Sequence, residues 1–105
     1  MRYLRMWREA VKAVARAVRD LGLDAEVYVI GGAAEGRLTV LSDVDVLVCV
    51  KRRLSPDEVW TLRKEILGLA VDKHGLPVDY PVELHIHDAG TCRELAKHVK
   101  TLRID

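Results

Sequence analysis

The segment Asp43–Val50 constrains the fold more than any other part of this 105-residue chain. Its even positions are valine, and its odd positions are Asp43, Asp45, Leu47 and Cys49. β-Branched residues favour strands, and a strand that is apolar on both faces must be covered on both. We therefore expect a central β-strand over these residues. Successive side chains of a strand point to opposite faces, so Asp43 and Asp45 should share one face.

The remaining elements follow from apolar spacing and from turn residues. Helical steps of three and four, capping patterns such as Ser55-Pro56-Asp57-Glu58 and β-branched runs mark them along the chain. The expected elements are a helix over Met1–Leu21, a strand over Ala25–Ile30, a helix from Ser55 to about His74, a strand over Pro81–His87 and a final helix that starts near Thr91 and carries Leu95, Val99 and Leu102.

The order αβ(turn)βαβα predicts an α/β fold in which a three-stranded mixed β-sheet is packed by helices. A ten-residue link suits an antiparallel first pair, whereas the third strand follows a helical crossover and should run parallel to the second. This topology brings Gly31-Gly32, Asp43, Asp45 and Glu83 to the same end of the sheet. A chain of this length is expected to form one domain over residues 1–105.

Carboxylates that gather on an apolar sheet repel each other unless a proton or a cation intervenes. Asp43, Asp45 and Glu83 therefore predict a magnesium site, because Mg²⁺ prefers oxygen ligands and usually combines one or two carboxylates with water and phosphate. Two Mg²⁺ ions about 4 Å apart would hold the attacking and leaving oxygens of a phosphoryl displacement. Gly31 and Gly32 have no Cβ, so backbone amides there could approach a triphosphate closely.

These motifs carry a family resemblance. The run Ile30-Gly31-Gly32, ten further residues and Asp43-Val44-Asp45-Val46 resemble the signature of the DNA polymerase beta nucleotidyltransferase superfamily. Val82-Glu83-Leu84 resembles the third acidic motif of that superfamily. The spacing and size are most similar to the minimal nucleotidyltransferases, and Gly36 and Ser42 match their pattern in place.

The resemblance implies an enzyme that uses Mg²⁺ to transfer a nucleoside monophosphate, AMP from ATP above all, and that releases pyrophosphate. It implies that Asp43 and Asp45 are shared metal ligands. Glu83 would be a further ligand or the base that helps to deprotonate an acceptor hydroxyl. The nucleotide-binding residues that it implies are Gly31, Gly32, Arg37 and Ser42.

The chain departs from the family pattern at the phosphate-binding turn. Gly32 occupies the position of the usual serine, and Ala33 and Glu35 stand where basic residues are common. Arg37 is the cation that the turn offers to phosphate. The alternatives to an active enzyme are therefore a catalytically silent antitoxin that binds its partner and a regulatory nucleotide-binding module.

Three residues near the acids allow more than one interpretation. Asp79 precedes the third expected strand and is the alternative to Glu83 as the third acid. His85 and His87 should share a face with Glu83 because they follow it at even spacing. We interpret both histidines first as packing or surface residues, and a metal or catalytic role is the alternative, chiefly for His85.

A domain of this size leaves little mass for binding an acceptor, so a partner is expected to supply part of the site. The resemblance points to small helical HEPN proteins, which are often the toxins of toxin–antitoxin pairs with minimal nucleotidyltransferases. A homodimer is the alternative. Seventeen basic residues are balanced by 16 acidic ones, for a net charge of +1, so a nucleic-acid partner is not expected.

Composition bears on compartment and source. The longest strongly apolar run, Val44–Val50, falls far short of the roughly 20 residues that cross a bilayer, so we expect a cytoplasmic protein without membrane contact. The two cysteines do not amount to a disulfide framework; Cys49 should be a small buried apolar residue and Cys92 should lie near a helix start. The chain has no Asn and no Gln, which is a trend of hyperthermophile proteins.

Overall fold

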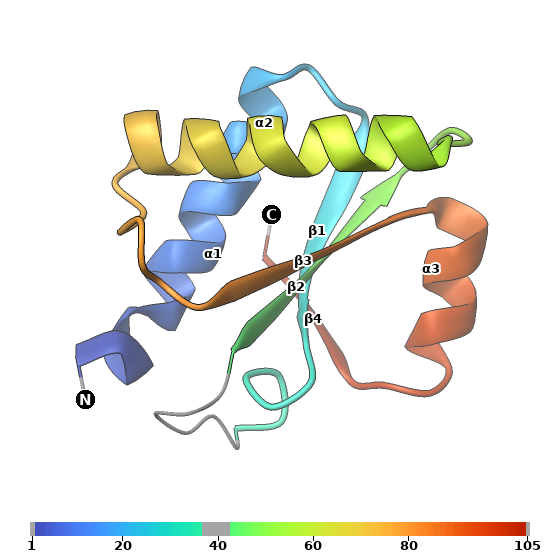
Figure 1. Cartoon of the computed structure of the whole chain (residues 1–105). Helices are drawn as coiled ribbons and strands as arrows, with labels where there is room; N and C mark the ends of the chain where they lie inside the picture. The colour runs from blue at the N-terminus through green and yellow to red at the C-terminus, as the bar shows by residue number, and fades with distance from the viewer. Residues whose placement is uncertain (1, 37–42, 105) are drawn as a thin grey trace.

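The computed structural model describes residues 2–36 and 43–104 of the chain. Helices α1 and α2 cover one face of a sheet, and α3 packs against the other face (Figure 1). The elements in chain order are α1 (Arg2–Asp20), β1 (Ala25–Ile30), β2 (Val44–Val50), α2 (Pro56–His74), β3 (Val82–Asp88), α3 (Ala89–Ala96) and β4 (Thr101–Arg103). The α/β fold predicted from the sequence is confirmed.

Within residues 2–36 and 43–104 the sheet has four strands, in the order β3-β2-β1-β4. Strand β1 runs antiparallel to β2, and β3 runs parallel to β2, as the turn and the helical crossover predicted. The prediction of three strands is wrong, because β4 adds to the free edge of β1 in antiparallel register. In the parallel pair Asp45 lies opposite Glu83, so both side chains stand on the same face.

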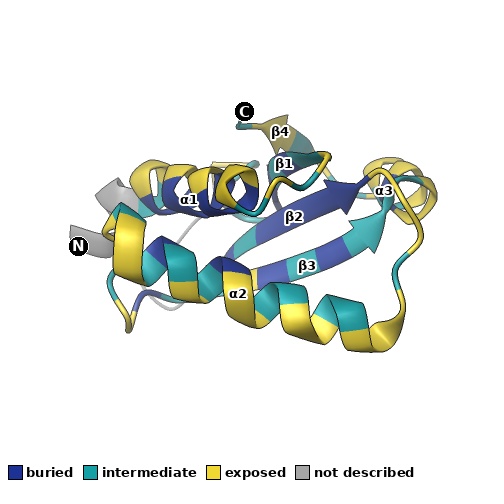
Figure 2. Ribbon diagram, turned by 90° about the horizontal axis from the view of Figure 1, so that it is seen from above, coloured by how far each residue is buried: buried dark blue, intermediate teal, exposed yellow. Residues whose placement is uncertain are grey.

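Alternation along β2 assigns a different environment to each face of the sheet. The valines of β1 and β2 pack against α1 and α2, and Val44, Val46 and Val48 are at most 1% exposed. The opposite face of β2 presents Leu47 and Cys49, which pack against α3. In Figure 2 the buried colour follows β2 and the side of α1 that faces the sheet. Strand β2 is therefore central, as expected.

The cap predicted for α2 is confirmed. Ser55 accepts a hydrogen bond from the Glu58 amide, and the Glu58 side chain accepts one from the Ser55 amide, which closes a capping box. Gly75 ends the helix in the left-handed region at φ 77°. None of the helices described is long and apolar enough to span a membrane.

The prediction for the last helix is wrong at both ends. Asp88, not Thr91, caps α3, because its Oδ1 accepts a hydrogen bond from the Thr91 amide at 2.8 Å. That hydrogen bond lowers the pKa of the Asp88 carboxyl, since it favours the ionised form. Leu102 was expected on the helix but lies in β4, where it pairs with Val29 of β1. Pairing satisfies backbone groups of the β1 edge that would otherwise lack partners.

The cysteine prediction is right about position, since Cys49 is buried and Cys92 lies near the start of α3, but it missed a disulfide. Cys49 of β2 and Cys92 of α3 form a disulfide with Cα atoms 6.0 Å apart. Both residues are buried, as expected for Cys49, but they link the sheet to α3 across 43 positions of sequence. No local spacing signals such a pair, because only the packing of α3 on the sheet brings the two residues together.

The disulfide gives a first testable prediction. In the chain-entropy account a cross-link across this separation contributes about 4 kcal/mol to the free energy of unfolding. Reduction with dithiothreitol should therefore lower stability by several kcal/mol in a denaturant titration. The double variant Cys49→Ala/Cys92→Ala should show no response to the reductant. Two reactive thiols in the air-oxidised, unfolded protein would contradict the linkage.

The two-sided burial of β2 gives a second prediction, with a matched pair of valines. Val48→Ala removes two methyl groups from a fully buried site and should cost about 2 kcal/mol, or more if a cavity remains. Val78→Ala makes the same change where the residue is 86% exposed and should shift stability by less than about 0.5 kcal/mol. Equal losses in urea denaturation would show that β2 is not the core strand.

Candidate functional site

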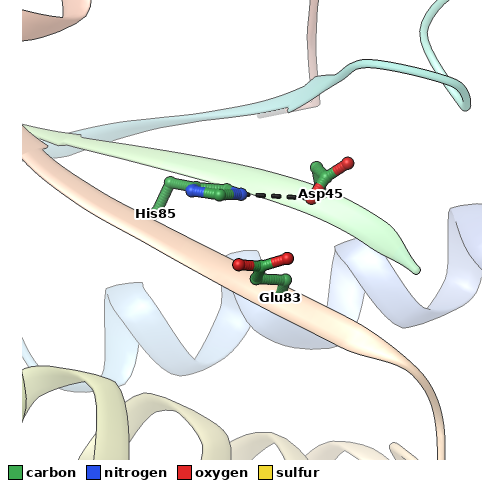
Figure 3. A group of neighbouring side chains, drawn as sticks. All are labelled: Asp45, Glu83 and His85. Atoms are coloured by element: carbon green, nitrogen blue, oxygen red, sulfur yellow. Dashed lines mark hydrogen bonds and ion pairs between the residues drawn. The ribbon is translucent and has the colours of Figure 1, made fainter.

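Two carboxylates and an imidazole gather where β2 and β3 run side by side. Oxygens of Asp45 and Glu83 and a ring nitrogen of His85 all lie within 4.8 Å of one another. Asp45 stands on β2, and the other two stand on β3 (Figure 3). The group occupies the sheet face opposite α1 and α2, where Glu83 is exposed and Asp45 and His85 are half-buried.

The sequence dictates this meeting through the strand register. The valines of β2 face the helices, so the residues between them face the other way. Helix α2 then returns the chain so that β3 runs parallel to β2, with Asp45 opposite Glu83 and Leu47 opposite His85. The backbone pairing alone therefore places both acids and the histidine on one face, whatever rotamers their side chains adopt.

Asp45 and His85 interact directly. The Nε2 atom of His85 lies 3.1 Å from Oδ1 of Asp45, a hydrogen bond in which the imidazole donates because the carboxylate has no proton to give. The side chains are 31% and 30% exposed, respectively, so the pair is partly shielded from water. Our first interpretation of His85 as a packing or surface residue missed this contact. The sequence signal for this contact was the spacing of two residues between Glu83 and His85, which puts both on the same face of the strand.

Gly31 lies against the other oxygen of Asp45. Its φ is +70°, and a Cβ at this position would sit 3.1 Å from Oδ2 of Asp45. The Glu35 amide donates to the Gly31 carbonyl at 3.1 Å, so the chain makes a helical turn directly after β1. The first residue of this turn, Gly31, therefore lies at one side of the acidic site.

The other predicted site residues have different positions. Asp43 is exposed and directly precedes β2, outside the group that joins Asp45 and Glu83. Gly32 is half-buried in the turn after β1. Asp79 is exposed in the turn before β3 and is not part of the group, so the structure brings Glu83 rather than Asp79 to Asp45.

Two further predicted residues, Arg37 and Ser42, lie outside the described residues.

The site face continues into a hollow beside α3. This hollow has a volume of about 450 Å³, and its floor includes Leu47 and the Cys49–Cys92 disulfide. Lys51 and Arg93 contribute cationic side chains to its lining. Leu47 is two positions from Asp45 on the same face of β2, so the hollow and the acidic group lie along one strand.

The donor set is suited to a divalent cation. Asp45 and Glu83 offer anionic oxygens, and two carboxylates at this separation repel each other unless positive charge lies between them. Among the described residues, His85 offers the one nitrogen donor of the group. The missing Cβ of Gly31 leaves room beside Asp45 that another residue would fill.

The close approach of Gly31 gives a third prediction. Gly31→Ala should lose about 1–2 kcal/mol for the left-handed backbone, and more because its Cβ would press on Asp45. Gly22→Ala is the matched control, since its φ is +68° but nothing lies within 4 Å of the added Cβ. Urea denaturation should give the larger loss at Gly31. Equal losses would mean that contact with Asp45 is unimportant.

Comparison with known proteins supports a common fold and family. A family model described as nucleotidyltransferase domain matches residues 11–102. No curated protein matches the chain. A proposed nucleotidyltransferase from Sulfolobus solfataricus has a similar structure, with a TM-score of 0.67 and 17% identity over 96% of this chain and 80% of that one.

A solved toxin–antitoxin structure with AMP-PNP is also similar. Its TM-score is 0.58 at 16% identity, and the match covers 90% of this chain and 71% of the other. At these identities the likeness of both structures shows a shared fold.

Proposed function

The chain belongs to the nucleotidyltransferase domain family, and we propose that it transfers a nucleoside monophosphate, AMP from ATP above all, to an acceptor hydroxyl with a divalent cation, Mg²⁺ in the first instance. The observation that carries this proposal is the register of the parallel pair, in which Asp45 faces Glu83 on an accessible side of the sheet. Gly31 adjoins the same carboxylate.

The residues present fit a hard cation. Asp45 and Glu83 supply oxygens, and Asp43, exposed just before β2, is proposed as a further ligand shared by two Mg²⁺ ions. When bound, the cation supplies charge neutralisation at the phosphate oxygens of the nucleotide. In the absence of a cation, the hydrogen bond from His85 orients Asp45 through Oδ1, and the missing Cβ of Gly31 leaves room beside Oδ2.

Glu83 is proposed to act on the acceptor. Its carboxylate is exposed, so an acceptor hydroxyl can reach it. As the acceptor oxygen forms a bond to the α-phosphorus, the bond from that phosphorus to the pyrophosphate oxygen breaks, and Glu83 receives the hydroxyl proton. Asp45 lies across the strand pair and would hold the cation rather than take that proton.

The turn after β1 is proposed to receive the phosphates. Backbone amides at the start of a helical turn carry partial positive charge and attract anions. Gly31 and Gly32 keep this backbone accessible, and Arg37 and Ser42 are proposed as further nucleotide contacts. Within the described part of this turn, residues 31–36, there is no cationic side chain. Nucleotide binding should therefore depend strongly on the backbone and on the cation.

A protein partner is proposed to complete the site. One similar structure is a toxin–antitoxin complex with AMP-PNP, which supports a toxin as the partner of this chain and an adenine nucleotide as its substrate. We propose a small helical HEPN-type protein, with a homodimer as the alternative. Residues 1–105 would then act as a single minimal domain, and the hollow beside α3 offers space on the site face for part of a substrate or partner.

The fourth prediction tests catalysis. Wild-type protein with Mg²⁺, labelled ATP and its partner should transfer label, and Asp45→Asn should reduce the rate by roughly 10²–10³-fold or more because a charged metal ligand is lost. Asp72→Asn removes an exposed acid from α2 and should leave transfer within about twofold. Transfer can be followed by gel autoradiography, with circular dichroism to show that each variant folds.

Two results would change the conclusion. Equal transfer by wild type and Asp45→Asn would show that the acidic group is not the reaction centre. Absence of transfer by the wild type with a partner that binds it would favour the catalytically silent antitoxin, which the lack of cations at residues 31–36 already suggests.

A further inference from the structure

We propose that His85 is a ligand of the cation that Asp45 and Glu83 hold, and that the resulting oxygen and nitrogen site prefers first-row transition-metal ions such as Mn²⁺ and Zn²⁺ to Mg²⁺. This inference rests on the proposed function in one respect, since it takes the two carboxylates as metal ligands. It adds a third ligand and a metal preference that an all-carboxylate site would not have.

The geometry of the three side chains supports a shared ion. Their ligand atoms lie within 4.8 Å of one another. Ligands bound at about 2.0–2.2 Å are separated by about 3 Å at right angles and about 4.2 Å when opposite, so small side-chain rotations would bring all three onto one ion. The Nε2 atom of His85 already lies 3.1 Å from Oδ1 of Asp45, a spacing close to that of neighbouring ligands.

The orientation of the imidazole is fixed by its surroundings. Figure 3 shows one ring nitrogen of His85 directed at Asp45, and the dashed line marks their hydrogen bond. His85 is only 31% exposed, and its strand is hydrogen-bonded to β2 throughout, so little freedom would be lost when the ring binds an ion. His87 follows on the same face but lies opposite Cys49 and outside the group.

The chemistry of the ligands determines the preference. Mg²⁺ takes oxygen ligands and gives up its bound water reluctantly to a nitrogen ligand. Imidazole, in contrast, suits zinc and other first-row transition metals. Asp45 and Glu83 alone would bind Mg²⁺ and Mn²⁺ similarly. Addition of His85 should strengthen the binding of Mn²⁺ and Zn²⁺ and leave Mg²⁺ dependent on the two carboxylates.

The partners of the two acids support a cation beside the imidazole. Among the described residues, Glu83 has no ion pair or hydrogen bond, and the Asp45 carboxylate has His85 as its hydrogen-bond partner. A cation between the two acids would relieve their repulsion. The cation would also replace the hydrogen bond between His85 and Asp45. Both side chains would then bind the same ion instead of each other.

The first measurement compares two metals in variants of the full chain. Electron paramagnetic resonance of free Mn²⁺ gives the Mn²⁺ affinity of protein stripped with EDTA, and competition gives the Mg²⁺ affinity. His85→Ala should weaken Mn²⁺ binding by roughly 10-fold or more and change Mg²⁺ binding by less than about twofold. His87→Ala is the matched control and should change neither.

The second measurement observes the ligand atom. Long-range ¹H–¹⁵N spectra of the imidazoles, titrated with Zn²⁺, should show a large shift of the His85 Nε2 resonance, assigned by its loss in His85→Ala. A smaller shift is expected for His87. A role in merely positioning Asp45 would leave the nitrogen unbound and would alter Mn²⁺ and Mg²⁺ affinity together.

The outcomes separate this inference from the proposed function. One outcome is that both ions bind tightly, with binding abolished by Asp45→Asn and unchanged by His85→Ala. That result would overturn the role of His85 as a ligand and keep the carboxylate site. Equal weakening of both metals in folded His85→Ala would also overturn it. Binding of no metal by the wild type would overturn the ligand and the proposed metal dependence together. Circular dichroism and thermal unfolding establish that each variant is folded.

Discussion

The parallel pairing of β2 with β3 holds the rest of the site in place. Valines on alternate positions of β2 are fixed against α1 and α2, so the residues between them must stand on the other face. Helix α2 returns the chain so that Glu83 meets Asp45 and His85 follows two positions later. A one-residue shift in the register of β3 would turn Glu83 and His85 toward the helices and separate them from Asp45.

Much of this arrangement could be predicted because it depends on rules that ignore side-chain detail. A short link favours an antiparallel pair, a helical crossover favours a parallel one, and alternation assigns faces. Those rules sufficed to place Glu83 beside Asp45. The α2 boundaries were predictable for a similar reason, since Ser55, Glu58 and Gly75 act through local hydrogen bonds and a local left-handed turn.

What could not be predicted depends on tertiary distance. The Cys49–Cys92 disulfide and the pairing of Leu102 with β1 join segments far apart in sequence. The start of the last helix was missed for a local reason, because Asp88 accepts a hydrogen bond from the Thr91 amide and caps the helix before the predicted start. Alternation placed His85 on the correct face, but only the rotamer of its ring shows that Nε2 reaches Asp45.

One contact at the edge of the sheet bears on how other molecules can approach. Strand β3 is an edge strand, and the Leu84 carbonyl accepts a hydrogen bond from the Arg63 guanidinium of α2 at 3.2 Å. Charged side chains at an edge oppose strand addition by other chains. A second molecule that extended the sheet by pairing with the Leu84 carbonyl would have to displace Arg63 from it.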